Sequence, residues 1–307
     1  MKALYLAALA SGLSFICKPA VAQQNIDIVN VNKIMNDTTW KSKTEFGANL
    51  NQGSFNSAWT GGGVNSVAIG VYFNALRELK VGKHTWRNDL QAQYGIVRNQ
   101  GMSSRKNIDR LFFDSKYGYQ ISKNWSVVGN VNFLTQFAPG YQYGEDVDGN
   151  ETKSIISGFL APGYLTEAIG IQYSPVPYFY ATFSPGAMRQ TFVKRKDLGE
   201  EMQDWKNYGV APGKVFRNEV SLFQIVANYD NAIAKNMNLK WRYQMFAAMN
   251  KARNTPFHTD HRLDAILTAK VNKWVNVNVG AIMIYDDDQV NRVQWAQSLS
   301  LGFLYTF

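Results

Sequence analysis

Two histidines flank an acid in the stretch His258-Thr259-Asp260-His261. Imidazoles beside a carboxylate could ligate a metal or act as an acid–base pair. The acidic run at 286–288 could face His261 across a rim, which leaves a rim-located hydrolase open as a third function. No third ligand stands near the pair, and no His-x-Ser pair occurs in the sequence. We therefore expect an exposed, solvated histidine pair, no metal site there, no catalytic residues and no enzyme.

A second candidate is the acidic stretch 145–151, whose weak calcium ligands are Asp146, Asp148 and Asn150. An EF-hand loop needs glycine at its sixth position and a bidentate glutamate at its twelfth. Counted from Asp146, the glycine here comes fourth. A solvated acidic loop is the expectation. The triplet Gly61-Gly62-Gly63 lacks the Lys-Ser/Thr ending of a phosphate loop, and the sequence predicts no cofactor.

Charged side chains also recur at every second position of segments that alternate apolar and polar residues. On the polar positions the bases are Lys41, Lys43, Arg87, Arg110, Lys116, Lys240, Arg242, Arg262 and Lys270. The acids there are Glu45, Asp89, Asp114 and Asp264. If these positions line a pore, their basic excess favours anions. Alternatively, the charges pair across neighbouring strands and fill a narrow barrel.

The segments that carry these charges read as membrane strands, most clearly between Trp295 and Phe307. One parity there includes Trp295, Leu299, Leu301, Phe303, Tyr305 and Phe307, and the other carries small or polar side chains, with Leu304 as its one large exception. A tilted membrane strand needs about 9–11 such residues between aromatic girdles. The membrane-interface aromatics that we expect are Trp125, Trp241, Tyr285, Trp295, Phe303, Tyr305 and Phe307. A final phenylalanine is typical of chains inserted by the outer-membrane assembly machinery, an expected partner.

Segments of this kind predict about twelve strands, with ten or fourteen as neighbouring possibilities. They are 40–50, 64–77, 84–98, 108–121, 125–137, 163–173, 178–192, 215–229, 237–247, 261–271, 275–285 and 295–307. Short and long links alternate between them, as do the periplasmic turns and outer loops of bacterial barrels. We therefore predict an all-β fold, a transmembrane antiparallel up-and-down β-barrel in the bacterial outer membrane, with both termini periplasmic. Glu167 and Pro185-Gly186 disturb the alternation. A β-bulge that switches parity is the usual explanation, and a miscounted strand is the alternative.

The N-terminus has the form of a secretory signal peptide over residues 1–22. It combines a basic start, an apolar run over 3–16 and a small-x-small site ending at Ala22. A periplasmic lead-in over 23–39 and the barrel over 40–307 then follow. Cys17 is the only cysteine, so the mature chain offers no disulfide and no thiolate ligand. The same residue leaves a lipid-anchored protein open as an alternative.

Charge narrows the expected partners. Cleavage would remove Lys2 and Lys18 and lower the formal charge from +9 by two, to +7. A basic balance suits anionic partners such as lipopolysaccharide, beside membrane lipid. No nucleic-acid motif accompanies the charge, so no nucleic acid is expected. No run after residue 22 approaches the roughly 18 apolar residues of a membrane helix.

The segment 46–66 resembles the N-terminal signature of a Bacteroidetes outer-membrane β-barrel family classed as a domain of unknown function. Its motif here is Phe-Gly-Ala-Asn-Leu-Asn-Gln-Gly-Ser-Phe at 46–55, followed by Trp-Thr-Gly-Gly-Gly-Val-Asn-Ser at 59–66. The resemblance implies a barrel and an outer-membrane location, and it implies no activity.

These observations favour a passive channel for small, anionic solutes. The alternative is a non-conducting structural or docking subunit that binds other envelope proteins. The long loop 138–162 could fold into the mouth of the barrel. A loop inside the mouth would plug the barrel, whereas a loop outside it would leave a channel.

Overall fold

The computed structural model describes residues 40–56, 64–194, 207–211, 213–249, 257–272, 274–286 and 290–306. The expected signal peptide, the lead-in over 23–39 and Phe307 lie outside the described residues. No helix in the described ranges reaches the length and hydropathy needed to cross a membrane.

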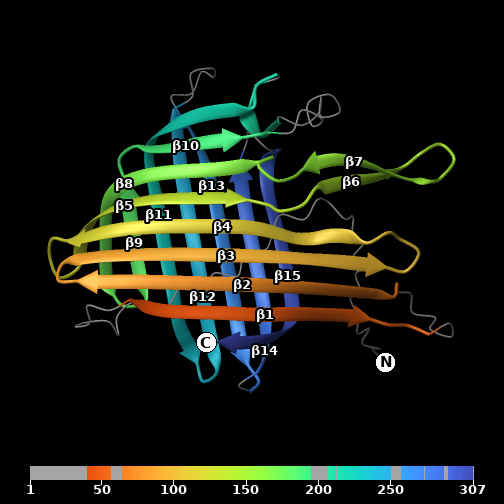
Figure 1. Cartoon of the computed structure of the whole chain (residues 1–307), viewed down its shortest axis with the longest axis horizontal. Coiled ribbons are helices and arrows are strands. Elements are labelled where there is room, and N and C mark those ends of the chain that lie inside the picture. The colour runs from red at the N-terminus through yellow and green to blue at the C-terminus, as the bar shows by residue number, and fades with distance from the viewer. Residues whose placement is uncertain are drawn as a thin grey trace, which may run out of the picture.

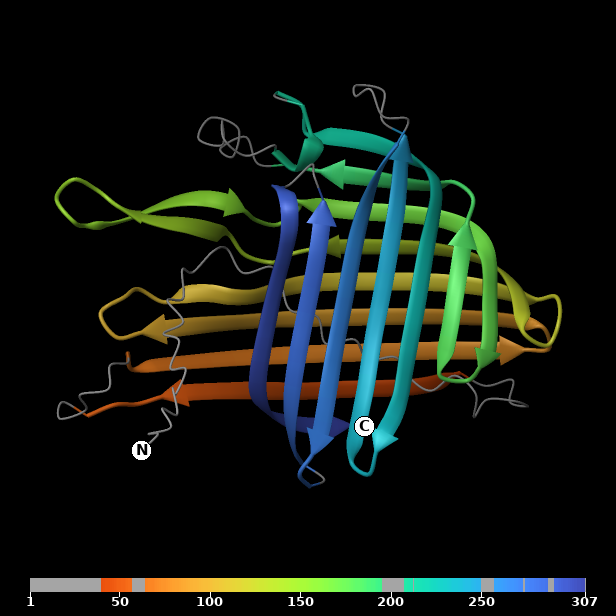
Figure 2. The ribbon, with the colours of Figure 1, turned by 180° about the vertical axis from the view of Figure 1, so that it is seen from behind.

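The described chain forms one closed antiparallel sheet, with a separate two-stranded hairpin. The hairpin strands are β6 (Gly140–Glu145) and β7 (Glu151–Ser157). The sheet strands are β1 (Lys41–Gly53), β2 (Ser66–Val81), β3 (His84–Asn99), β4 (Arg105–Gln120), β5 (Trp125–Thr135), β8 (Gly163–Val176), β9 (Phe179–Ser184), β10 (Ala187–Phe192), β11 (Phe216–Ala234), β12 (Met237–Met249), β13 (Phe257–Lys270), β14 (Val275–Asp286) and β15 (Val290–Thr306). Figure 1 shows β1 to β5 in front of β11 to β15, and Figure 2 shows the same two walls from behind.

Pairing of the first and last strands closes the barrel, with Ala48 opposite Phe303. Of the thirteen strands in the sheet, β9 and β10 follow one another between the same neighbours, β8 and β11. They are therefore two halves of one barrel strand, which leaves twelve. The predicted twelve-stranded antiparallel barrel is confirmed.

Side chains alternate between a polar interior and an apolar exterior. On β8, Ile169 on the outer face is 70% exposed, whereas Thr166 on the inner face is 3% exposed. On β13 the inward Asp264 is 2% exposed. A soluble protein buries the apolar face, whereas a membrane barrel presents it to lipid. The lumen is not wholly polar, because Ile266, Ile282 and Ile284 are also buried.

The break at Pro185-Gly186 is a bulge that switches parity. Thr182 and Ser184 are buried before it, and Ala187 and Thr191 are buried after it. Gly186 has φ 87°, a backbone conformation open to glycine. The neighbouring strand β11 shifts register between Ser221 and Phe223, so both strands bulge.

The parity switch expected at Glu167 is absent. Glu167 pairs with Val131 on one side and Met188 on the other, within unbroken registers. Because Thr166 and Ala168 beside it are buried, Glu167 lies on the outward parity. The prediction was wrong here because β8 needs no bulge: the neighbouring strand bulges at Pro185-Gly186 instead.

The hairpin β6–β7 lies within the loop 138–162 and does not fold into the mouth. Figures 1 and 2 both show it extending away from the barrel body. At its base, Ala161, Val193 and Val210 form a small buried cluster with Ile155 and Tyr208. The hydroxyl of Tyr208 donates to the carbonyl of Ile156 at 3.0 Å, and burial raises the pKa of Tyr208 to about 12. The connection between β5 and β8 thereby packs against the connection between β10 and β11.

Candidate functional site

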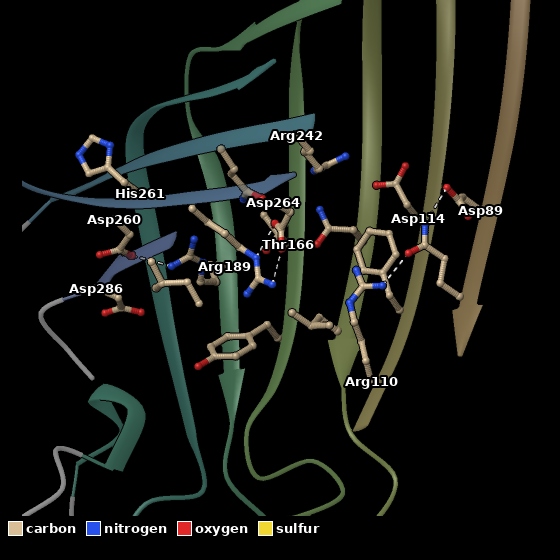
Figure 3. A pocket seen from close by; sticks show the side chains of 18 of the residues that line it. Asp89, Arg110, Asp114, Thr166, Arg189, Arg242, Asp260, His261, Asp264 and Asp286 are labelled. Atoms are coloured by element: carbon tan, nitrogen blue, oxygen red, sulfur yellow. Dashed lines mark hydrogen bonds and ion pairs between the residues drawn. The ribbon is translucent and has the colours of Figure 1, made fainter. Parts of the chain in front are cut away.

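A cavity of about 130 Å³ lies inside the barrel, room for about ten water molecules. Its walls come from β3, β4 and β5 on one side and β12, β13 and β14 on the other, joined by β8, β9 and β10. Figure 3 shows the charged side chains that project from these strands. The bases that line it are Arg87, Arg110, Lys116, Arg189, Arg242 and Arg262, and the acids are Asp89, Asp114, Asp260, Asp264 and Asp286.

Two close ion pairs occupy the β10–β13 side of this cavity. Nε and Nη2 of Arg262 donate to the two carboxylate oxygens of Asp264 at 2.7 and 2.8 Å. Nη1 of Arg189 donates to Asp260 at 2.7 Å. Charge-assisted bonds of this length hold both partners in place, so this part of the lumen is preorganised.

Polar bonds also order the β3–β4 side. Nη1 of the buried Arg110 donates to Gln91 Oε1 at 2.6 Å, and Gln91 Nε2 donates to Asp89 at 3.1 Å. The ammonium of Lys116 donates to Gln172 at 2.9 Å and lies 4.0 Å from the ring centre of Tyr180. Arg87 lies 3.8 Å from Glu78.

Asp114 and Arg242 differ from these residues. Both line the cavity, yet within the described chain neither makes a hydrogen bond or an ion pair. In Figure 3 the guanidinium of Arg242 points toward the side of the cavity where Asp114 lies. The cavity thus holds one cation and one anion that no described residue neutralises by direct contact.

The cavity is less basic than the sequence predicts. Six bases and five acids leave a formal charge of +1, whereas the predicted lumen set has nine bases and four acids. Sequence reasoning missed Arg189, Asp260 and Asp286 as lining residues. Arg189 reaches the lumen only after the bulge at 185–186 switches parity. Asp260 does so because β13 begins at Phe257, earlier than predicted.

Five residues predicted to line the lumen lie outside this cavity. Lys43 forms an ion pair with Glu45 on β1, the strand that also carries Lys41. Lys240 lies 3.6 Å from Asp230, and Lys270 is exposed at the end of β13. Because Asp230 follows the predicted end of its strand, its pairing with Lys240 escaped the sequence analysis.

The histidine stretch is strand, not an exposed loop. His261 lies beside Tyr243, whose hydroxyl contacts its Nδ1 at 2.8 Å, and its Nε2 contacts Thr259 Oγ1 at 3.0 Å. In Figure 3 its ring points away from the acids of the cavity. Asp260, one residue earlier, faces Arg189 instead. Strand alternation separates Asp260 from His261, so these two residues do not form an acid–base pair, whereas His258 lies on the same face of β13 as Asp260.

The acidic stretch forms the turn of the hairpin β6–β7. The carboxylate of Asp146 accepts hydrogen bonds from the backbone amides of Asn150 and Asp148 at 2.8 and 3.0 Å. These bonds, with Asn150 the largest contributor, lower the pKa of Asp146. Ser103, and then Arg105, hold the pKa of Glu151 below its usual value. No group of three or more His, Cys, Asp or Glu side chains that could hold a metal ion occurs in the described ranges.

Aromatic side chains lie toward both ends of the barrel strands, Trp125 and Trp241 near the short turns and Tyr285 near the opposite end. Trp125 packs against Tyr173 at 4.6 Å between ring centres, and Trp241 stacks on Tyr229 at 5.9 Å. Phe303 and Trp295 are exposed on the exterior. Tyr285 lies 6.3 Å from His261, ring to ring. The backbone of Tyr305 pairs with that of Phe46 at the barrel closure. Such belts are typical of membrane–water interfaces.

Comparison with known proteins gives one partial family match. Residues 50–141 match a family described as "Protein of unknown function (DUF3078)". Among proteins with curated descriptions, none matches the sequence.

Solved structures give distant likenesses. The translocator domain of the autotransporter NalP from Neisseria meningitidis is 12% identical, with 89% of this chain and 90% of that chain covered and a TM-score of 0.41. The NanC porin is 8% identical, with 85% and 98% covered and a TM-score of 0.38. The beta domain of the Bordetella autotransporter BrkA is 9% identical, with 88% and 99% covered and a TM-score of 0.31. The assignment of the fold rests on the strand pairing of this chain itself.

Proposed function

We propose that the protein is a passive channel of the bacterial outer membrane for small polar solutes, with a mild preference for anions. One observation carries this proposal: a charged cavity in the barrel lumen with room for about ten water molecules. An outward hairpin in place of a plug supports it, because none of the cavity-lining residues comes from 138–162. The single excess positive charge favours anions only weakly.

The orientation that accompanies this function puts both termini and the short turns in the periplasm. Short turns join β2 to β3 and β11 to β12 at the end where β1 begins and β15 finishes. The family match over 50–141 includes most of the 46–66 motif, which supports membership of the Bacteroidetes barrel family that the motif resembles.

The experiment is reconstitution of the purified barrel in a planar bilayer under a potassium chloride gradient. We expect stepwise conductance and a reversal potential displaced modestly toward the chloride potential. Absence of conductance from a correctly folded barrel would refute the channel, and displacement toward the potassium potential would refute the anion preference.

A docking subunit is the second candidate, and Glu167 is the observation that favours it. An ionisable side chain on a lipid-facing surface is costly and often marks a functional contact. Gln190, on the adjoining β10, lies on the same outward parity. A photo-crosslinking residue in place of Glu167, in whole cells, should yield a discrete protein adduct if the barrel docks there. Lipid adducts alone would refute docking at this position.

A further inference from the structure

The two unpartnered charges of the cavity have opposite signs and come from different walls. Asp114 lies on β4 and Arg242 on β12. With β9 and β10 counted as one strand, four strands lie between β4 and β12 in one direction around the barrel and six in the other. Asp114 and Arg242 are therefore placed to contact the two ends of one solute.

The surroundings of Asp114 favour a cation. Asp89 stands directly opposite Asp114 in the β3–β4 register. Like charges in this position repel one another, and a bound cation would relieve the repulsion. Arg110 interacts with the charge of Asp89, whereas the bases on the same strands as this pair are engaged elsewhere: Arg87 faces Glu78, and Lys116 is held by Gln172 and Tyr180.

The surroundings of Arg242 favour an anion. Arg242 and Arg262 both lie close enough to Arg110 to interact with its charge. Arg262 is engaged by Asp264 through two bonds, and Arg110 donates to Gln91. The planar guanidinium of Arg242 is left to receive a carboxylate, which its geometry suits in bidentate form.

We propose that the cavity binds a small zwitterion, with its ammonium at Asp114 and its carboxylate at Arg242. The ligand class is the free amino acid or a compound of the same charge pattern. This zwitterion would be the solute of the proposed channel. The inference rests on the channel function because the ligand reaches the site through the channel. A solute with one charge would leave either Asp114 or Arg242 unsatisfied, whereas a zwitterion satisfies both.

Calorimetry on the detergent-solubilised full barrel tests the proposal with three probes of similar length: γ-aminobutyrate, butyrate and butylammonium. We expect γ-aminobutyrate to bind at least about tenfold more tightly than either singly charged probe, since each loses one charge-assisted contact. Butyrate binding as tightly as γ-aminobutyrate would show a simple anion site and overturn the proposal. No binding by γ-aminobutyrate would overturn it as well.

Variants locate the site. Arg242→Gln and Asp114→Asn should each weaken γ-aminobutyrate by about tenfold or more. Lys240→Gln and Asp230→Asn are matched controls, because this ion pair lies outside the cavity, and they should leave binding unchanged. Equal weakening in the controls would overturn the assignment of Arg242 and Asp114. Each variant is folded if it migrates faster on a gel before boiling than after boiling. The three-probe comparison on the native chain does not depend on any variant.

Conductance separates this inference from the channel itself. Ion conductance without a preference for the zwitterion overturns the inference and leaves the channel standing. Zwitterion binding without conductance supports the site and overturns the channel.

Discussion

Replacement of Asp264 by alanine should destabilise the barrel by about 3–5 kcal/mol, the cost of removing one partner from a buried ion pair. The side chain of Asp264 is 2% exposed and that of Arg262 is 24% exposed. Alanine would remove both acceptors of Arg262 at once. It would also remove a negative charge that offsets the repulsion between Arg262 and Arg110. Because Arg262 keeps some access to cavity water, we expect the lower end of the range.

Two further variants separate charge from shape. Asp264→Asn retains one acceptor, so its cost should be smaller, about 1.5–3 kcal/mol for a bond to a charged group. The double variant Arg262→Met with Asp264→Leu removes both charges and should recover most of the stability lost in Asp264→Ala.

Urea unfolding in lipid vesicles, followed by tryptophan fluorescence, measures these differences. Asp230→Ala provides the comparison, because Asp230 faces Lys240 at the longer distance of 3.6 Å. If Asp264→Ala costs less than about 1 kcal/mol, or no more than Asp230→Ala, the pair does not stabilise the barrel as its geometry implies.

Three further predictions concern other parts of the molecule. Arg242→Glu changes the cavity from six bases and five acids to five and six, from +1 to −1. At about 10 Å in water each unit charge is worth ~0.4 kcal/mol, so the reversal potential should change sign, whereas Lys240→Glu should leave the sign unaltered. Gly170→Ala would make the new Cβ overlap the carbonyl of Phe183 and the hydroxyl of Ser184, and should cost about 1–3 kcal/mol in urea unfolding. Gly129→Ala, with nothing within 4 Å, is the control, and equal losses would contradict the steric account. The ionised carboxylate of Asp146 accepts the hydrogen bonds that hold the hairpin turn, and these bonds lower its pKa. The turn should therefore stay ordered above that pKa and lose its order as the pH falls through it. The amide signal of Asn150, followed by NMR, should titrate below pH 3.8, and a midpoint at or above 3.8 would contradict the hydrogen bonds.

The fold could be predicted because the alternation of apolar and polar side chains is a property of each strand by itself. Apolar and polar side chains that alternate over a dozen residues fix both the strand and its outward face. The errors fall at strand ends, where polar residues are tolerated on either parity. The predicted strand 261–271 is in fact Phe257–Lys270, so the stretch read as a histidine loop is the rim of β13.

The site was less predictable because its chemistry depends on relations between strands. Arg262 and Asp264 share one face at a separation of two residues, a pairing that sequence alone could have suggested. The Arg189–Asp260 pair could not have been found in this way, since a one-residue bulge decides that Arg189 points inward. Register likewise decides that Asp89 stands opposite Asp114, and register follows from turns and bulges that single-strand patterns do not specify.

The distribution of paired and unpaired charge argues for transport over a purely structural lumen. A charge removed from water costs free energy unless a partner replaces its hydration. In a filled, structural interior every charge would therefore be expected to have a direct partner, as Arg262 and Arg189 do. Among the residues that the structure describes, Asp114 and Arg242 instead line the cavity without a direct partner, although acids and bases are both close at hand. Their solvation requires that the cavity stay wet, and a wet, charged space inside a membrane barrel can admit a polar solute.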